Sequence, residues 1–159
     1  MRPALIAFIA SLLALCPGCR SLTPLPEANL QQPGWKVREG QAVWQSKRAA
    51  PEIAGELLVA TRPEGDSFVQ FTKNPFPMVT ARTTATQWQI ESPLQNRRYT
   101  GRGHPPARIV WLLLPKVLTG APPPAGWTWQ QIDRTQWRLS ACGRLSRTLA
   151  REPATTRLF

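Results

Sequence analysis

The sequence predicts a mainly β domain in which a curved antiparallel meander is covered by one short helix. Three observations support this fold class. Short runs of strand-forming residues alternate with turn residues, seventeen prolines disfavour long helices, and a single apolar segment interrupts the succession of strands. With 159 residues, the chain has the length of one domain.

The strand-forming runs follow one another at short intervals. We expect strands at residues 35–46, 52–61, 67–72, 78–84, 87–91, 127–132 and 136–142. Turn residues separate two pairs of them at 62–66 and 73–77. In the fifth run Trp88 and Ile90 alternate with polar residues, which predicts one face toward the core and one toward water.

One segment has helical rather than strand character. Pro105 and Pro106 suit the start of a helix, and residues 107–114 after them are rich in large apolar side chains. Gly120 suits the helix end, but Pro115 interrupts the run, so we expect two short helical turns or a kink. An apolar helix of this kind needs a surface to cover, and a curved sheet provides one.

The first eighteen residues have the pattern of an export signal. Arg2 is followed by twelve residues, 4–15, that are apolar except for Ser11. This length fits the apolar region of a signal peptide and is short for a membrane span. The alternative is a short buried core helix, which the terminal position and the preceding basic residue disfavour.

The end of this stretch, Gly18-Cys19, resembles the bacterial lipoprotein signal, in which a small residue precedes a cysteine that receives diacylglycerol and becomes the new N-terminus. The resemblance implies that Cys19 is lipidated, with Cys16 as the alternative site and simple secretion as the alternative outcome. Arg20 after the cysteine favours sorting to the outer membrane. We therefore expect a lipid anchor at the periplasmic face of the outer membrane.

Composition argues against several classes of function. One histidine and three cysteines exclude a zinc site built from several Cys and His ligands, and we expect neither a metal nor a cofactor. His104 lies in a basic turn, and no nucleophile-elbow, phosphate-loop or dinucleotide motif is present, so we assign no catalytic residue and expect no enzyme. Cys142 is expected to be a small buried residue.

The formal net charge of +11 is typical of nucleic-acid binding, but export removes that partner. A basic cluster consists of Arg97, Arg98, Tyr99, Arg102 and Arg108. For an anchored protein the better partner is the anionic headgroups of lipids. A generally basic, solvated surface is the alternative.

Three stretches of the body resemble the LolA/LolB-like lipoprotein-sorting family, and most of all its outer-membrane receptor branch. Residues 35–40, from Trp35 to Gly40, resemble the receptor's first strand; residues 71–77 resemble the loop after its third strand; residues 109–120 resemble its lid helices. The likeness covers residues 35–145. It implies an incomplete antiparallel β-barrel, with a short helical lid over an apolar cavity that holds acyl chains.

The resemblance implies one exposed site, and the predicted fold suggests a second, internal one. Phe76 matches the receptor's protruding loop leucine, which helps to hand lipoproteins to the membrane; the alternative is that its ring packs in the core. A half-barrel under one lid leaves more apolar wall than its side chains fill. Candidate wall residues, which alternatively only form the core, are Trp44, Leu57, Val59, Phe71, Trp88, Ile90, Trp111 and Leu114.

The organisation expected from these patterns has four parts. They are a signal peptide at 1–18, a proline-containing tether at 19–34, a β-rich half-barrel domain at 35–147 and a basic tail without regular structure at 148–159. The expected function is binding of acyl chains of lipids or lipoproteins, as a receptor or carrier anchored to the membrane. The alternative is a structural or accessory lipoprotein of an envelope complex, which acts through protein–protein contacts and has no ligand cavity.

Overall fold

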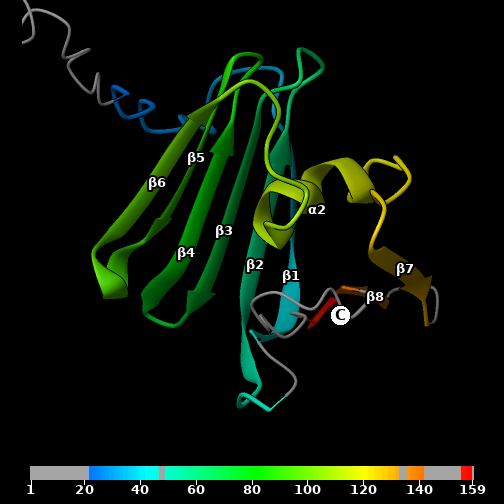
Figure 1. The fold of residues 1–159 in the computed structure, drawn as a ribbon. Helices are drawn as coiled ribbons and strands as arrows, with labels where there is room; N and C mark the ends of the chain where they lie inside the picture. The colour runs from blue at the N-terminus through cyan, green and yellow to red at the C-terminus, as the bar shows by residue number, and fades with distance from the viewer. Residues whose placement is uncertain (1–21, 47–48, 133–135, 142–154, 159) are drawn as a thin grey trace, which may run out of the picture.

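The computed structural model describes residues 22–46, 49–132, 136–141 and 155–158 (Figure 1). Over these ranges the predicted class is confirmed, because the chain forms a mainly β domain with an antiparallel sheet and one α-helix. The sheet is open: among the described strands, the two at its ends, β6 and β7, each pair with one neighbour and not with each other.

Six strands form a meander in chain order, and three more extend it. The meander consists of β1 (Lys36–Gln45), β2 (Ile53–Thr61), β3 (Ser67–Lys73), β4 (Phe76–Thr83), β5 (Gln87–Ser92) and β6 (Arg97–Arg102). The extension consists of β7 (Trp127–Gln131), β8 (Trp137–Ala141) and β9 (Thr155–Leu158), and the order across the sheet is β6-β5-β4-β3-β2-β1-β9-β8-β7. A 3₁₀ turn, η1 (Pro93–Gln95), joins β5 to β6.

The seven predicted strands are confirmed as β1 to β5, β7 and β8, with ends that differ by two residues at most. The largest difference is at β4, which begins at Phe76, inside the predicted turn. The hairpin turn is only two residues long, Asn74 and Pro75 with a cis peptide bond between them, and Lys73 already pairs with Phe76.

Two strands, β6 and β9, lie where the sequence predicts none. β6 occupies part of the basic cluster, and β9 occupies four residues of a tail expected to lack regular structure, so that prediction is wrong for residues 155–158. The reason is that strand pairing requires backbone groups only. As an edge strand whose side chains are mostly exposed, β6 needs no apolar alternation to pair with β5.

The helical cover is α2 (Val110–Leu118), a single helix that passes through Pro115. The expectation of two separate turns is therefore wrong. A proline in a helix interior costs about 3 kcal/mol, whereas full burial of each Leu or Val contributes about 1.5–3 kcal/mol, and α2 buries six apolar side chains besides Pro115. The predicted helix end is confirmed: Gly120, at φ +96°, donates its N–H to the carbonyl of Val117.

The core lies on the face of the sheet that α2 covers, which we call the inner face (Figure 1). The strand registers place one row of inner-face residues across the meander, namely Arg38, Val59, Val69, Ala81, Ile90 and Tyr99. Next to this row Phe71 stacks on Trp111 of α2, with ring centroids 5.3 Å apart. Trp44 meets both rings edge-on, at 6.4 Å and 5.4 Å. This aromatic cluster fixes α2 on the sheet.

The opposite, outer face is crossed by residues 22–34, which we call the N-terminal strap. The backbone N–H of Leu25 donates to Gln89 Oε1 at 2.7 Å. Arg82 Nη1 donates to the carbonyls of Leu25 and Pro26, each at 2.9 Å. Farther along, Arg62 donates to Gln32 Oε1 at 2.9 Å. The expected tether is thus without helix or strand over 22–34, but it is bonded to the sheet.

The prediction that the polar residues of β5 face water is wrong at Gln89, because the strap covers this residue. Ala60, Phe68, Arg82 and Gln89 form one row on the outer face. Ala60 and Gln89 are at most 1% exposed, and Phe68 is also buried, although no helix of the described ranges packs there. A polar residue can occupy this row because the strap supplies the hydrogen-bond partner that burial demands.

At the edge of the inner face, Gly101 of β6 lies directly against the indole of Trp88. A Cβ at position 101 would stand 2.7 Å from Trp88 Nε1 and closer still to two ring carbons. The absence of a side chain on Gly101 therefore allows Trp88 to lie over the edge strand and partly cover it.

We predict that Gly101→Ala lowers the free energy of unfolding by about 1–3 kcal/mol, because the added methyl displaces the indole. Urea unfolding followed by circular dichroism measures this change. In a Trp88→Ala background the same substitution should lower the free energy of unfolding clearly less, since the obstructing ring is gone. An equal loss of unfolding free energy in the two backgrounds would show that something other than Trp88 excludes a side chain at position 101.

Candidate functional site

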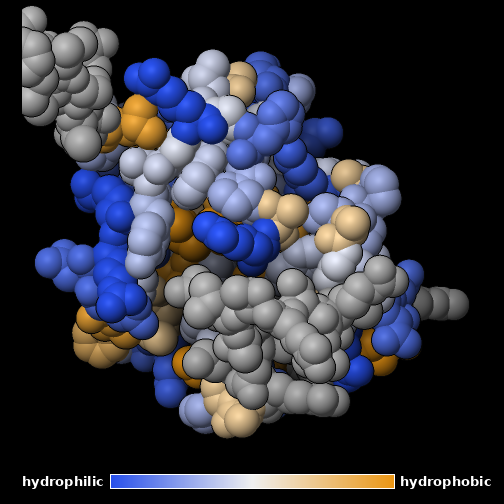
Figure 2. Space-filling model, in the orientation of Figure 1, coloured by the Kyte–Doolittle hydropathy of each residue, from blue (hydrophilic) through white to orange (hydrophobic). Residues whose placement is uncertain are grey.

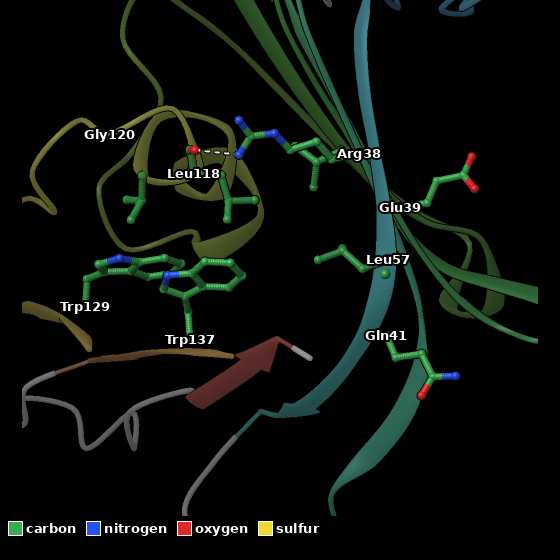
Figure 3. Close-up of a pocket in the computed structure, with 11 residues that line it drawn as sticks. Arg38, Glu39, Gln41, Leu57, Leu118, Gly120, Trp129 and Trp137 are labelled. Carbon is green, nitrogen blue, oxygen red and sulfur yellow. Dashed lines mark hydrogen bonds between the residues drawn. The ribbon is translucent and has the colours of Figure 1, made fainter. Parts of the chain in front are cut away.

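A pocket of about 360 Å³ opens between β1, β2, the C-terminal end of α2 and the β7–β8 hairpin (Figure 3). Its lining residues are Arg38, Glu39, Gly40, Gln41, Leu57, Val59, Val117, Leu118, Gly120, Trp129 and Trp137. Six of these contribute apolar side chains, so the wall is mainly hydrocarbon and aromatic ring.

Each wall has a local structural cause. Leu57 and Val59 are alternate residues of β2 and therefore point to the same, inner face. Trp129 of β7 and Trp137 of β8 lie on the same face of their hairpin, since Trp137 pairs with the residue two places after Trp129. The two indoles stack, with centroids 6.2 Å apart and planes at 14°. They form one continuous aromatic wall of the pocket (Figure 3).

Arg38 is the charged group that faces this pocket. Its Nη1 donates to the carbonyl of Leu118 at 2.8 Å, which joins β1 to the last turn of α2 (Figure 3). The carbonyls at a helix C-terminus carry partial negative charge, so the guanidinium is favourably placed. Glu39 and Gln41, the alternate residues on β1, point away from the pocket (Figure 3).

The structure places the eight predicted wall residues in two groups. Leu57 and Val59 line the pocket. The other six are not among its lining residues: Phe71, Trp111 and Leu114 are buried in the core, and Trp44, Trp88 and Ile90 are partly buried against it. The expected inward direction of Trp88 and Ile90 holds, but they lie toward β6, away from the pocket on the β1 side.

Sequence reasoning missed Arg38, Val117, Leu118, Trp129 and Trp137. A signal existed for the two tryptophans, because the last two predicted strands, 127–132 and 136–142, are close enough to pair as a hairpin. Period-two alternation in such a pair places Trp129 and Trp137 on one face. No local pattern indicates that this hairpin faces the end of α2, because that arrangement depends on the whole sheet.

Phe76 lies at the end of the sheet formed by the β3–β4 and β5–β6 hairpins. Its side chain is 59% exposed, and Leu94 of η1 is 58% exposed. The two hairpins are joined where Ser92 Oγ donates to the carbonyl of Met78 at 3.2 Å. Figure 2 shows hydrophobic surface at the lower left, where Figure 1 places these hairpin ends. In the structure the ring of Phe76 therefore protrudes from the sheet end and does not pack in the core.

The remaining predicted sites are of two kinds. Cys16, Cys19 and Cys142 lie outside the described residues. His104 and the basic cluster are exposed, and Arg98 Nε pairs with Glu91. Over the described ranges, no three His, Cys, Asp or Glu side chains gather as a metal site. Among the helices of those ranges, none has the length and apolarity needed to cross a membrane.

We predict that Phe76→Ala changes the free energy of unfolding by less than about 0.5 kcal/mol, as is usual for an exposed residue. The matched control is Phe71→Ala. Loss of this fully buried ring should lower the free energy of unfolding by about 3–5 kcal/mol. Urea unfolding of both variants measures the contrast. A loss at Phe76 comparable with that at Phe71 would contradict the exposed position.

The chain was also compared with known proteins. No protein-family model matches it, and no curated protein matches it. The function proposed below therefore depends on the geometry of this chain and on the patterns in its sequence.

Proposed function

We propose that this chain is a lipid-anchored envelope protein that binds acyl chains of lipids or lipoproteins, as a receptor or carrier. The observation that carries the proposal is the pocket walled by Leu57, Val59 and the stacked pair Trp129 and Trp137. Its volume of about 360 Å³ lies in the range of small-molecule sites. A pocket with mostly apolar walls suits hydrocarbon better than a polar metabolite.

In this proposal the open sheet acts as an incomplete β-barrel and α2 acts as its lid. The curved meander supplies one wall, and the C-terminal turn of α2 supplies another. The hydrogen bond from Arg38 to Leu118 holds that turn against β1 at the pocket. An acyl chain would enter beside this bond and lie along the two indoles.

The chemistry of the lining matches the two parts of an acylated ligand. Each methylene transferred from water to such a wall contributes about 0.8 kcal/mol. A guanidinium has five N–H donors, and Arg38 donates from Nη1 to the carbonyl of Leu118 across the pocket. Its other donors suit the ester carbonyl or carboxylate at the head of an acyl chain.

The proposed anchor is Cys19, three residues before Leu22, where the described part of the chain begins. The export pattern and Gly18-Cys19 support it. Phe76 and Leu94, both exposed at one end of the sheet, suit contact with a bilayer or with an acylated partner.

We predict that a brominated fatty acid quenches tryptophan fluorescence, because bromine quenches indoles that it contacts and two indoles line the pocket. A Trp129→Phe/Trp137→Phe variant should lose most of this quenching while keeping the pocket apolar. The control is Trp35→Phe, which removes an indole stacked on Arg62 at 4.5 Å, outside the pocket. Undiminished quenching in the double variant would refute binding at this site. Absence of quenching together with a stable crosslinked partner would favour the accessory-subunit alternative.

We also predict that Cys19→Ser abolishes incorporation of labelled palmitate by cells that express the full chain. Cys16→Ser and Cys142→Ser are the matched controls and should retain the label. Loss of label in Cys16→Ser alone would move the anchor to that residue, and absence of label from the unaltered chain would contradict lipid anchoring.

A further inference from the structure

The N-terminal strap crosses the sheet in a definite direction. Gln32 is bonded to Arg62, just after β2, whereas Leu25 is bonded to Gln89 of β5. Read toward the N-terminus, the strap thus runs from β2 across the outer face to β5. In Figure 1 the blue segment accordingly leaves the sheet near the upper ends of β5 and β6, on the side away from β7. The strap therefore runs toward the β6 edge as it approaches the N-terminus.

A partly buried polar network holds this part of the strap. Gln89 is 1% exposed and uses both ends of its amide: Oε1 accepts from Leu25, and Nε2 donates to Glu91 at 2.8 Å. Arg82 donates to the strap and lies 3.8 Å from the second oxygen of Glu91. Arg98 of β6 pairs with the same carboxylate. The strap is thus tied to β4, β5 and, through Glu91, to β6.

This attachment limits how far the body stands from an anchor at Cys19. Leu25 is six positions after Cys19, and even a fully extended chain of that length reaches only about 20 Å. A lipid on Cys19 would therefore hold the β6 edge close to the bilayer. The pocket side of the sheet, toward β7 and β8, would face away from it.

The β5–β6 hairpin, residues 87–102, has a surface suited to that position. It carries three arginines, Arg97, Arg98 and Arg102, against one acidic residue, Glu91, which is already paired with Arg98. All three arginines are exposed. Tyr99 and Leu94 are more than half exposed beside them. Cations interspersed with an aromatic and an aliphatic side chain match the charged headgroups and the apolar margin of an anionic bilayer.

We propose that the β5–β6 hairpin docks on the anionic lipid headgroups of the membrane that holds the anchor, in an orientation set by the strap. This proposal rests on the proposed lipidation of Cys19. Two observations favour a bilayer surface as the partner. Leu25, six residues after Cys19, is bonded to Gln89 of β5, and the charge of the hairpin complements that of anionic headgroups. If the arginines served only to protect an exposed strand edge from aggregation, the hairpin would have no preferred distance from the lipid.

The test measures the distance of two parts of the protein from the bilayer. The full chain, processed by the cell and purified from membranes, is reconstituted in phosphatidylcholine vesicles with or without phosphatidylglycerol. In a Cys142→Ser background, a fluorescent donor is attached at Gln95→Cys in η1 or at Gln130→Cys in β7, both exposed positions. Energy transfer to headgroup-labelled lipid should be greater from 95 than from 130 in anionic vesicles, and this difference should shrink without phosphatidylglycerol.

Charge variants separate docking from simple proximity. Arg97→Gln/Arg102→Gln leaves the Arg98–Glu91 pair intact and should lower the ratio of docked to undocked protein by about five-fold per charge removed. Lys36→Gln/Lys116→Gln removes the same charge from exposed positions off the hairpin and should leave the ratio unchanged. Gln89→Leu, which deletes the hydrogen bond between the strap and β5, should reduce the difference between the two donors even with every arginine present.

Equal transfer from 95 and 130, or equal effects of the two charge variants, would overturn the docking proposal. The mass of the purified chain is measured first. A chain without the diacylglyceryl mass would overturn the anchoring, and this proposal with it. A lipidated chain with equal transfer would overturn the docking alone and leave the anchoring and the acyl pocket standing.

Discussion

The packing of one short helix on a wide sheet is the constraint on which the rest of this structure depends. A nine-residue helix is about 14 Å long, whereas six strands span about 24 Å. α2 contacts β2, β3, β4 and β5, where the cluster of Trp44, Phe71 and Trp111 holds it. Both margins of the inner face are therefore left for other elements to cover.

The two margins are covered differently. Toward β6, Trp88 lies over Gly101 and closes the margin with one aromatic ring. Toward β1, the β7–β8 hairpin approaches the helix end but does not fill the space, and the pocket is what remains. A cavity at this place is thus a consequence of sheet width and helix length. This is why its walls come from β2, the end of α2 and two late strands.

Strands could be predicted from the sequence where one face is apolar, as in β5, whose Trp88 and Ile90 alternate with polar residues. The same rule fails where tertiary structure changes the environment. Gln89 is polar yet buried, because a segment more than fifty residues earlier in the chain covers it. β6 is a strand without apolar alternation, because its partner supplies the backbone bonds. Pro115 is accommodated within a helix because the apolar side chains around it are buried.

The strap also sets an order of events in a chain made from its N-terminus. The N–H of Leu25 and the carbonyls of Leu25 and Pro26 find their partners 56 to 64 residues later, at Gln89 and Arg82. Until β4 and β5 have been synthesised, the strap has no surface to bind. If Cys19 is acylated as proposed, completion of the sheet then fixes the strap, and with it the anchored end, against the folded body.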